Sequence, residues 1–167
     1  MTIFKQTFAN FLEHKARLKV INVASCNREL KPNAAAKMLI DVVAPNAIFF
    51  LDYKFTQTYS NIMANPKLGV SYMDDDNFTG YRLTGTCTVL ESGSEFNAAQ
   101  KRWEKLLISY EADRMLKRMR GDYSTRDAEN KLPKDFVIVK FLAAESAVIK
   151  PDRVFRSKAG PESESSD

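Results

Sequence analysis

The spacing of the strand-like segments constrains the fold of this chain more than any other feature of its sequence. Segments rich in β-branched and aromatic residues follow one another, and most connections between them have hairpin length. Short connections favour antiparallel neighbours, whereas a parallel sheet needs long crossovers. No Gly-rich phosphate loop follows the first strand, which excludes the usual dinucleotide-binding fold. The pattern predicts a mainly β protein, an antiparallel barrel to which helices are added, with strands over 18–24, 32–43, 47–51, 67–72, 78–91, 136–141 and 147–149.

Two of these strands have special features. Residues 33–37 have helical propensity, but the flanking turns and the apolar run that follows favour a strand over 32–43. In the long strand 78–91, Gly80 and Gly85 mark bulges or close approaches of another backbone.

Three segments carry helical patterns, and they are expected over 4–18, 56–65 and 95–120. The short middle helix begins at a threonine cap, Thr56 or Thr58, and ends at Asn65, which precedes a proline. On the long helix, Trp103 and Tyr110 lie on one apolar face, which we expect to pack on the barrel or on a dimer partner. Its many basic residues are diluted by acidic ones, so a solvated face explains them better than a nucleic-acid surface.

The composition fits one domain. The 167 residues, 44% of them hydrophobic, suffice for a single core, and we place the domain at 1–156 and a disordered polar tail at 157–167. No apolar run is long enough to cross a bilayer and the N-terminus lacks the apolar core of a signal peptide, so we expect a cytoplasmic protein without membrane contact. The net charge of +4 favours an anionic partner such as a phosphate, but is too small to indicate nucleic acid.

No residue pattern identifies a metal site or a catalytic group. Cys26 and Cys87 lie in separate strand-like segments without ligand partners nearby, and we expect two reduced, buried thiols. The acidic turn 74–77 lacks the central glycine and the closing glutamate of a calcium loop. His14 is the single histidine, and we expect it on the surface of the first helix. The catalytic residues, if any, therefore stay unknown.

Three stretches in register give the sequence a resemblance to a known family. They are Lys31 to Leu39 (KPNAAAKML), then Asp52 to Asn61 (DYKFTQTYSN) followed by Asn65-Pro66, and finally Asn77 to Thr86 (NFTGYRLTGT). In order and spacing, they resemble the FMN-binding split-barrel proteins related to pyridoxamine 5'-phosphate oxidase, above all the small, mostly uncharacterised flavoproteins of that group. The resemblance covers roughly residues 8–151 and implies an antiparallel split β-barrel that is usually a homodimer, with FMN in a groove at the dimer interface.

The resemblance also implies which residues hold the cofactor. Along the isoalloxazine ring it places Ala34, Ala35, Ala36, Lys37 and Met38. Around the ribityl chain and phosphate it places Lys54, Phe55, Thr56, Gln57 and Thr58. It adds Arg82, on a strand near the interface, with a less defined role.

The chemistry of these residues agrees with that assignment. A flat ring needs a wall without bulky side chains, which successive alanines supply. A phosphate needs hydroxyls, N–H groups and a cation, and a helix start provided with Thr56, Thr58 and Lys54 offers them, with Lys37 as a second cation. Each residue also has a simpler interpretation: a packed strand, an exposed strand lysine, or a helix cap.

The chain departs from the family at two places. Several relatives carry a glycine and a basic residue where this chain has Thr56 and Gln57, so the phosphate clamp is less positive and FMN is bound more weakly. The C-terminal Arg-x-His pattern of the true oxidases is absent, because Arg153 and Arg156 are not so arranged. This departure argues against the vitamin B6 reaction.

Three functional hypotheses remain open. The first is an FMN-dependent oxidoreductase, a flavin reductase or a relative of pyridoxamine phosphate oxidase, with NAD(P)H as a plausible electron donor. The second is a flavin carrier or sensor without catalysis. The third is a split barrel that binds another ligand, haem or a deazaflavin. Turnover of NAD(P)H separates the first hypothesis from the second, and an absorption spectrum separates both from the third.

Overall fold

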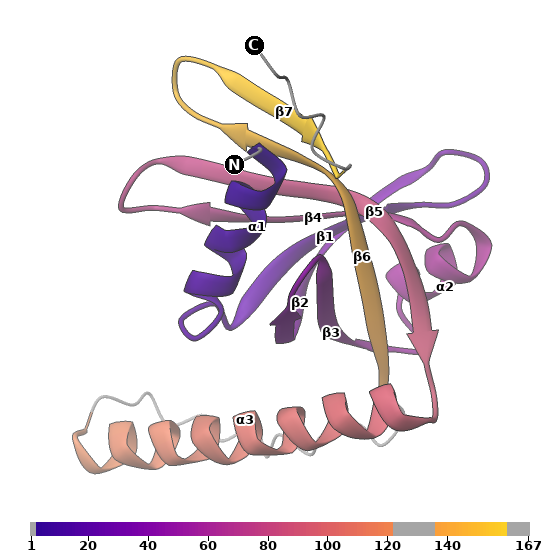
Figure 1. Ribbon diagram of the computed structural model, residues 1–167. Helices are drawn as coiled ribbons and strands as arrows, with labels where there is room; N and C mark the ends of the chain where they lie inside the picture. The colour runs from indigo at the N-terminus through magenta and orange to yellow at the C-terminus, as the bar shows by residue number, and fades with distance from the viewer. Residues whose placement is uncertain (1–2, 122–135, 160–167) are drawn as a thin grey trace.

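The computed structural model describes residues 3–121 and 136–159, which form an antiparallel β-barrel with helices around it (Figure 1). The helices are α1 (Ile3–His14), α2 (Gln57–Ala64) and α3 (Ser94–Met119). The strands are β1 (Val20–Cys26), β2 (Pro32–Val43), β3 (Ala47–Tyr53), β4 (Lys67–Asp74), β5 (Thr79–Leu90), β6 (Phe136–Ile149) and β7 (Val154–Lys158). The predicted antiparallel barrel with added helices is confirmed, as is the predicted order of helices and strands up to α3.

The strands follow the order β3-β2-β1-β4-β5-β6-β7, and all the pairs are antiparallel. A further pairing of β3 with β6 closes β1 to β6 into a barrel. β7 stays outside the ring and pairs with the far end of β6 alone, as the projecting hairpin in Figure 1 shows. Among the described strands, the closed ring leaves β7 as the short edge strand that could pair with other chains.

β6 is one strand, although the sequence predicts two, at 136–141 and 147–149. Its first half pairs with β3 and its last residues pair with β7, while β5 runs beside residues 138–149. Pairing with β5 on one side, and with β3 and then β7 on the other, thus holds the small and polar residues 142–146 in the strand, against their local sequence character. The same hairpin makes Ser157 and Lys158 part of β7, although the sequence places them in the tail. The rest of the predicted polar loop and tail, 122–135 and 160–167, lies outside the described residues.

α1 contributes its aromatic side chains to the main core. Phe4, Phe8 and Phe11 are buried with the inward residues of the barrel, and the ring of Phe11 meets that of Tyr72 edge-on at 4.6 Å. The helix ends at His14, earlier than predicted, because the next residues form a turn on its carbonyl oxygen before β1 begins. The periodicity of the phenylalanines therefore identified the buried face, but not the end of the helix.

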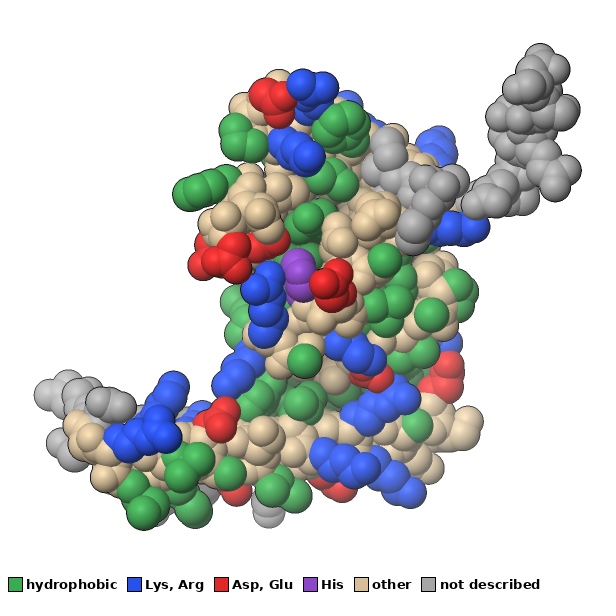
Figure 2. Space-filling view, turned by 60° about the vertical axis from the view of Figure 1, so that its left-hand side comes forward, with side chains coloured by type: hydrophobic (Ala, Val, Ile, Leu, Met, Phe, Trp, Pro, Cys, Tyr) green, Lys and Arg blue, Asp and Glu red, His purple; other side chains and the backbone are tan. Residues whose placement is uncertain are grey.

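α3 lies across one end of the barrel and continues past it (Figure 1). Ala99 and Trp103 are its buried residues, and they pack with Phe49, Leu51 and Ile138 of the barrel. This packing confirms the predicted role of Trp103. Figure 2 shows the projecting end of α3 with basic side chains on one side and apolar ones on the other, where Ile108, Met115, Leu116 and Met119 are exposed.

Gly85 marks the place where the long strand β5 shifts its register against β6. A Cβ atom on Gly85 would overlap the carbonyl oxygen of Leu142 and lie 2.9 Å from its carbonyl carbon. The prediction of a bulge and close approach is thus confirmed for Gly85. It is wrong for Gly80, where the pairing is regular and a Cβ atom would meet the Cβ of Ile149 at an ordinary 3.5 Å.

Candidate functional site

The structure divides the predicted ring-binding residues between the two faces of β2. Side chains of a strand alternate between its faces, and the exposed Ala34 and Ala36 point outward with Met38, while Ala35 and Lys37 point inward. Ala35 pairs with the fully buried Val23, which places it on the core side. The side chains of these five residues therefore do not all face the same surface.

The outward alanines belong to a surface of small side chains that spans three strands. Ala34 pairs with Ala24 of β1, which pairs in turn with Gly69 of β4. One step along the strands, Ala36 pairs with Asn22, and Asn22 pairs with Ser71. We call the surface made of Asn22, Ala24, Ala34, Ala36, Gly69 and Ser71 the small-residue face. No bulky side chain of these strands rises from it, so it can accept a flat ring or another flat protein surface.

Lys37 forms a buried ion pair instead of facing this surface. Its Nζ donates to Oδ1 of Asp52 over 2.6 Å, and the two side chains are 8% and 0% exposed. The same Oδ1 accepts from the backbone N–H of Tyr53 and from the hydroxyl of Thr56, both over 2.8 Å. Within the described part of the chain, the other oxygen of Asp52, Oδ2, is buried without a hydrogen-bond partner. The pair joins β2 to β3 and to the start of α2.

The threonines of α2 are occupied by its own structure. Thr56 is the N-cap, as predicted, and its Oγ1 accepts from the N–H of Tyr59 over 3.0 Å. Thr58 is 1% exposed, and its hydroxyl accepts from the side-chain amide of Asn33 over 3.1 Å. The exposed Gln57 donates to Asn61 over 2.8 Å. These contacts fasten α2 to the barrel and direct both threonine hydroxyls toward protein groups.

Lys54 and Phe55 lie on the exposed turn between β3 and α2. Lys54 forms an ion pair with Glu91 over 3.0 Å, and both partners are about half exposed. The ring of Phe55 is 77% exposed and stacks on that of Tyr53 with 5.4 Å between the centroids. Burial and the neighbouring Asp52 carboxylate raise the pKa of Tyr53. The turn thus presents a stacked aromatic pair to solvent rather than a cluster of cations.

Arg82, the last predicted cofactor residue, lies apart from α2, on the outward side of β5. It pairs with Ser71, so it borders the small-residue face. A groove of ≈ 620 Å³ begins there and is lined by Ala24, Gly69, Thr84 and Thr86 among others. The groove connects the small-residue face to β5 and β6.

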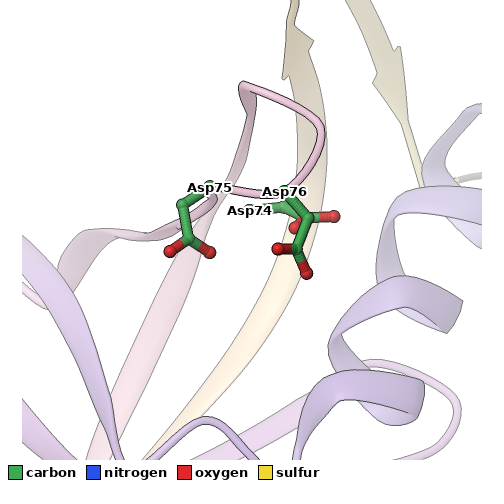
Figure 3. A group of neighbouring side chains, drawn as sticks. All are labelled: Asp74, Asp75 and Asp76. Carbon is green, nitrogen blue, oxygen red and sulfur yellow. The ribbon is translucent and has the colours of Figure 1, made fainter.

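Three aspartates meet at the turn between β4 and β5, where one oxygen of each lies within 4.8 Å of the others (Figure 3). Arg17 pairs with Asp74 and Asp76, and Asn77 donates to Asp74 over 2.9 Å. The hydrogen bond from Asn77 is the main cause that lowers the pKa of Asp74. These contacts explain the cluster as part of the turn.

The single histidine is on α1, as predicted, where it is half-buried. Nδ1 of His14 lies 2.9 Å from the hydroxyl of Tyr72, and the ring meets that of Tyr72 edge-on. Burial raises the pKa of Tyr72, so its hydroxyl stays protonated at neutral pH. His14 therefore serves the packing of α1 against β4.

The two cysteines are free thiols, as predicted, but they differ in exposure. Cys87 is buried, its Sγ donates to the carbonyl of Pro66, and burial raises its pKa to about 12. Cys26 is half-buried at the end of β1. Because the thiolate is the reactive form, we expect a disulfide-exchange reagent at pH 8 to modify Cys26 of the native protein much faster than Cys87. Denaturation should expose both, and a Cys26→Ser variant that still reacts rapidly would contradict this assignment.

A family comparison decides how this arrangement is to be interpreted. The sequence model of the pyridoxamine 5'-phosphate oxidase family matches residues 4–145, which is most of the chain. This chain belongs to the pyridoxamine 5'-phosphate oxidase family. The resemblance seen in the three sequence stretches is thereby confirmed. No curated protein sequence matches the chain.

Solved structures of low sequence identity share the fold of this family member. A protein from Clostridium acetobutylicum related to general stress protein 26 superimposes with a TM-score of 0.65 at 16% identity, covering 92% of this chain and 95% of that one. A pyridoxamine 5'-phosphate oxidase-related, FMN-binding protein from Nostoc punctiforme gives 0.58 at 9% identity, with 96% and 98% covered. A haem-binding protein from Mycobacterium smegmatis gives 0.60 at 13%, covering 95% of this chain and 58% of that one. None of the described helices is long and apolar enough to span a membrane.

FMN, the cofactor that the family implies, fits one part of this arrangement and not the other. The small-residue face offers the flat wall that an isoalloxazine ring requires. The start of α2 does not offer a phosphate clamp, since Lys37 is neutralised by Asp52 and Lys54 by Glu91. Among the described residues, Oδ2 of Asp52 has no hydrogen-bond partner, and an acceptor oxygen gives a phosphate nothing to bind.

Sequence reasoning missed the groups that occupy the predicted clamp. Asp52, Asn33 and Asn61 stand inside or beside the stretches that carry the resemblance, but their partners lie on other elements. A buried carboxylate next to a buried lysine has no local sequence signal. The acidic residue at the end of an otherwise apolar strand, Asp52 after 47–51, is the one sign that a buried partner was needed.

Proposed function

We propose that this chain binds FMN, with the flavin ring on the small-residue face, and acts as an oxidoreductase on a small molecule. The observation that carries the proposal is the outward row of alanines on β2, in a chain that belongs to the pyridoxamine 5'-phosphate oxidase family. Bound FMN supplies the redox chemistry, and the protein has to bind and orient it. Ala34 and Ala36 form the wall, and the exposed amide of Asn22 between Ala36 and Ser71 can bond the polar edge of a ring.

We further propose a homodimer, with NAD(P)H as the electron donor. An exposed sheet face of small side chains lets a second copy approach closely, and a ring held between two copies is shielded from water. Hydride transfer to a flavin needs no acid–base side chain, which agrees with the lack of a catalytic cluster in the sequence. If NAD(P)H is not oxidised by the flavin-loaded protein, a carrier or sensor role replaces the enzymatic one.

Haem is the second candidate, and the start of α2 favours it. The ion pairs of Lys37 and Lys54 leave that region without the charge that a phosphate requires, while a family fold of this type also occurs in a protein described as haem-binding. The single histidine, His14 of α1, is half-buried, and its Nδ1 is engaged by the hydroxyl of Tyr72. This position makes histidine ligation from this chain unfavourable, so we rank FMN first.

A bulky residue on the wall tests the ring assignment. Ala36→Phe should weaken FMN binding at least tenfold, because the new ring occupies the volume of the flavin. Thr88→Phe is the matched control, since Thr88 is also an exposed residue on a strand, near the distal end of β5. FMN fluorescence quenching gives the affinity, and circular dichroism shows whether both variants are folded. Equal affinity in the two folded variants would refute the placement of the ring.

A further inference from the structure

A second hollow lies where β5, β6 and β7 meet, next to the groove of the candidate site. Its volume is ≈ 240 Å³, and its lining includes Arg82, Thr84, Glu145, Arg156 and Lys158. Three of these five residues are cations and one is an acid. The hollow shares Arg82, Thr84 and Glu145 with the groove of ≈ 620 Å³ that leads to the small-residue face.

The register of the three strands places the two arginines on opposite sides of a small residue. Arg82 pairs with Ala147 of β6, and Ala147 pairs with Arg156 of β7. Residues paired directly across strands point to the same face, so both guanidinium groups rise on either side of Ala147, with their backbones about 10 Å apart. Ala147 is 2% exposed and does not itself line the hollow, which the two arginines share with Ser146 and Ser157. No hydrogen bond or ion pair joins Arg82 or Arg156 to another residue in the ranges 3–121 and 136–159.

The neighbouring row adds a hydroxyl and a third cation. Thr84 pairs with Glu145, which pairs with Lys158. Glu145 accepts from Thr84 over 3.4 Å and lies 3.6 Å from Lys158, so the carboxylate faces the lysine and the threonine. The two arginines keep their charge uncompensated in the hollow. Two guanidinium forks around a small residue make a geometry that suits a tetrahedral dianion.

We propose that this hollow binds the phosphate monoester of a small ligand. Arg82 and Arg156 contact the phosphate oxygens from two sides, while Lys158 and the Thr84 hydroxyl are engaged with Glu145. The body of the ligand lies in the adjoining groove, whose volume is within the range of small-molecule sites. The hollow thus supplies the positive charge that the start of α2 lacks.

Two sources can supply such a phosphate: FMN itself, or a second phosphorylated molecule bound beside the flavin. The first source rests on the proposed function, and the second does not. In both cases the phosphate binds Arg82 and Arg156 in the same way. Inorganic phosphate therefore tests the site, and a comparison of FMN with riboflavin tests which molecule carries the phosphate.

The test compares Arg82→Gln and Arg156→Gln with Arg153→Gln in the full chain. Arg153 is an exposed arginine near the start of β7 that already pairs with Asp152, and it does not line the hollow, so it controls for lost surface charge. Calorimetry with inorganic phosphate at constant ionic strength should show saturable binding to the wild type. Each hollow variant should weaken it about tenfold or more, and Arg153→Gln should change it less than twofold. Thermal unfolding verifies that all the variants are folded.

Titration with FMN and riboflavin identifies the source. If the phosphate is that of the flavin, the wild type prefers FMN at least tenfold, and Arg82→Gln and Arg156→Gln abolish this preference. If inorganic phosphate binds while the variants leave the preference unchanged, the site serves a second phosphorylated ligand. Absence of phosphate binding together with equal affinity for both flavins would overturn the inference but leave the proposed function standing. Equal losses in all three variants would overturn it too. Phosphate binding without any flavin binding would uphold the site and refute the proposed function.

Discussion

Replacing Lys37 by methionine should lower the free energy of unfolding by about 3–5 kcal/mol, the cost of breaking a buried ion pair by removing one partner. Asp52 is 0% exposed, and without Lys37 its carboxylate would be buried with only the donors of Tyr53 and Thr56. If the lysine were exposed, its ion pair would contribute only about 0–1 kcal/mol. Denaturant unfolding followed by circular dichroism measures the difference.

The double variant Lys37→Met with Asp52→Asn is the control for this prediction. Asparagine removes the buried charge but keeps a side-chain oxygen that accepts from Tyr53 and Thr56, so the double variant should regain a large part of the loss. If the double variant is as unstable as Lys37→Met, the buried charge is not the cause. If Lys37→Met alone costs less than about 1 kcal/mol, the lysine is solvated and the ion pair described above does not hold β2 to β3.

Gly85→Ala should be the most damaging single-methyl substitution in the barrel, with a loss of at least about 3 kcal/mol or no folded protein. The new Cβ would overlap the carbonyl oxygen of Leu142 and come within 3.0 Å of the Cα of Ala143, and both are backbone atoms of β6. A flexible side chain could move away, but here the ladder between β5 and β6 would have to open. In an unobstructed strand, alanine would stabilise relative to glycine by about 0.5–1 kcal/mol.

Gly80→Ala on the same strand is the matched control for Gly85→Ala. Its Cβ would meet the Cβ of Ile149 at 3.5 Å, an ordinary contact, so this variant should keep or slightly increase the stability. Comparison of the two midpoints in guanidinium chloride measures the effect of the close approach alone. Similar midpoints for both variants would show that the strands β5 and β6 do not come this close at Gly85.

Local sequence patterns were sufficient to predict the helices whose buried face or caps depend on residues close together in the sequence. The spacing of Phe4, Phe8 and Phe11 identified the buried face of α1, and Thr56 and Asn65 identified the ends of α2, because capping is a property of adjacent residues. In contrast, β6 is one continuous strand, and β7 forms at all, because of pairing with other strands. Neither strand has a strong apolar alternation of its own. The overall barrel could therefore be predicted, while its last hairpin could not.

The candidate site, too, depends on contacts between residues that are distant in sequence. The family stretches pointed to β2 and α2, but the side that a β2 residue faces depends on its register with β1, which separates Ala36 from Lys37. The pairing of Lys37 with Asp52 joins residues 15 positions apart in sequence, and the two arginines of the hollow, Arg82 and Arg156, meet only through β6. A lysine that the sequence suggests as a phosphate ligand can thus be paired with a buried carboxylate. Conversely, arginines far apart in the sequence can lie close together in the fold.

The central claim, that this family member binds a flavin on the small-residue face, is tested most directly by titrating FMN with the purified protein and following flavin fluorescence. The account predicts saturable quenching with one flavin per chain, and flavin absorption bands that remain with the protein after desalting. A colourless protein that leaves FMN fluorescence unchanged at every concentration would contradict it, and haem would then become the first ligand to test.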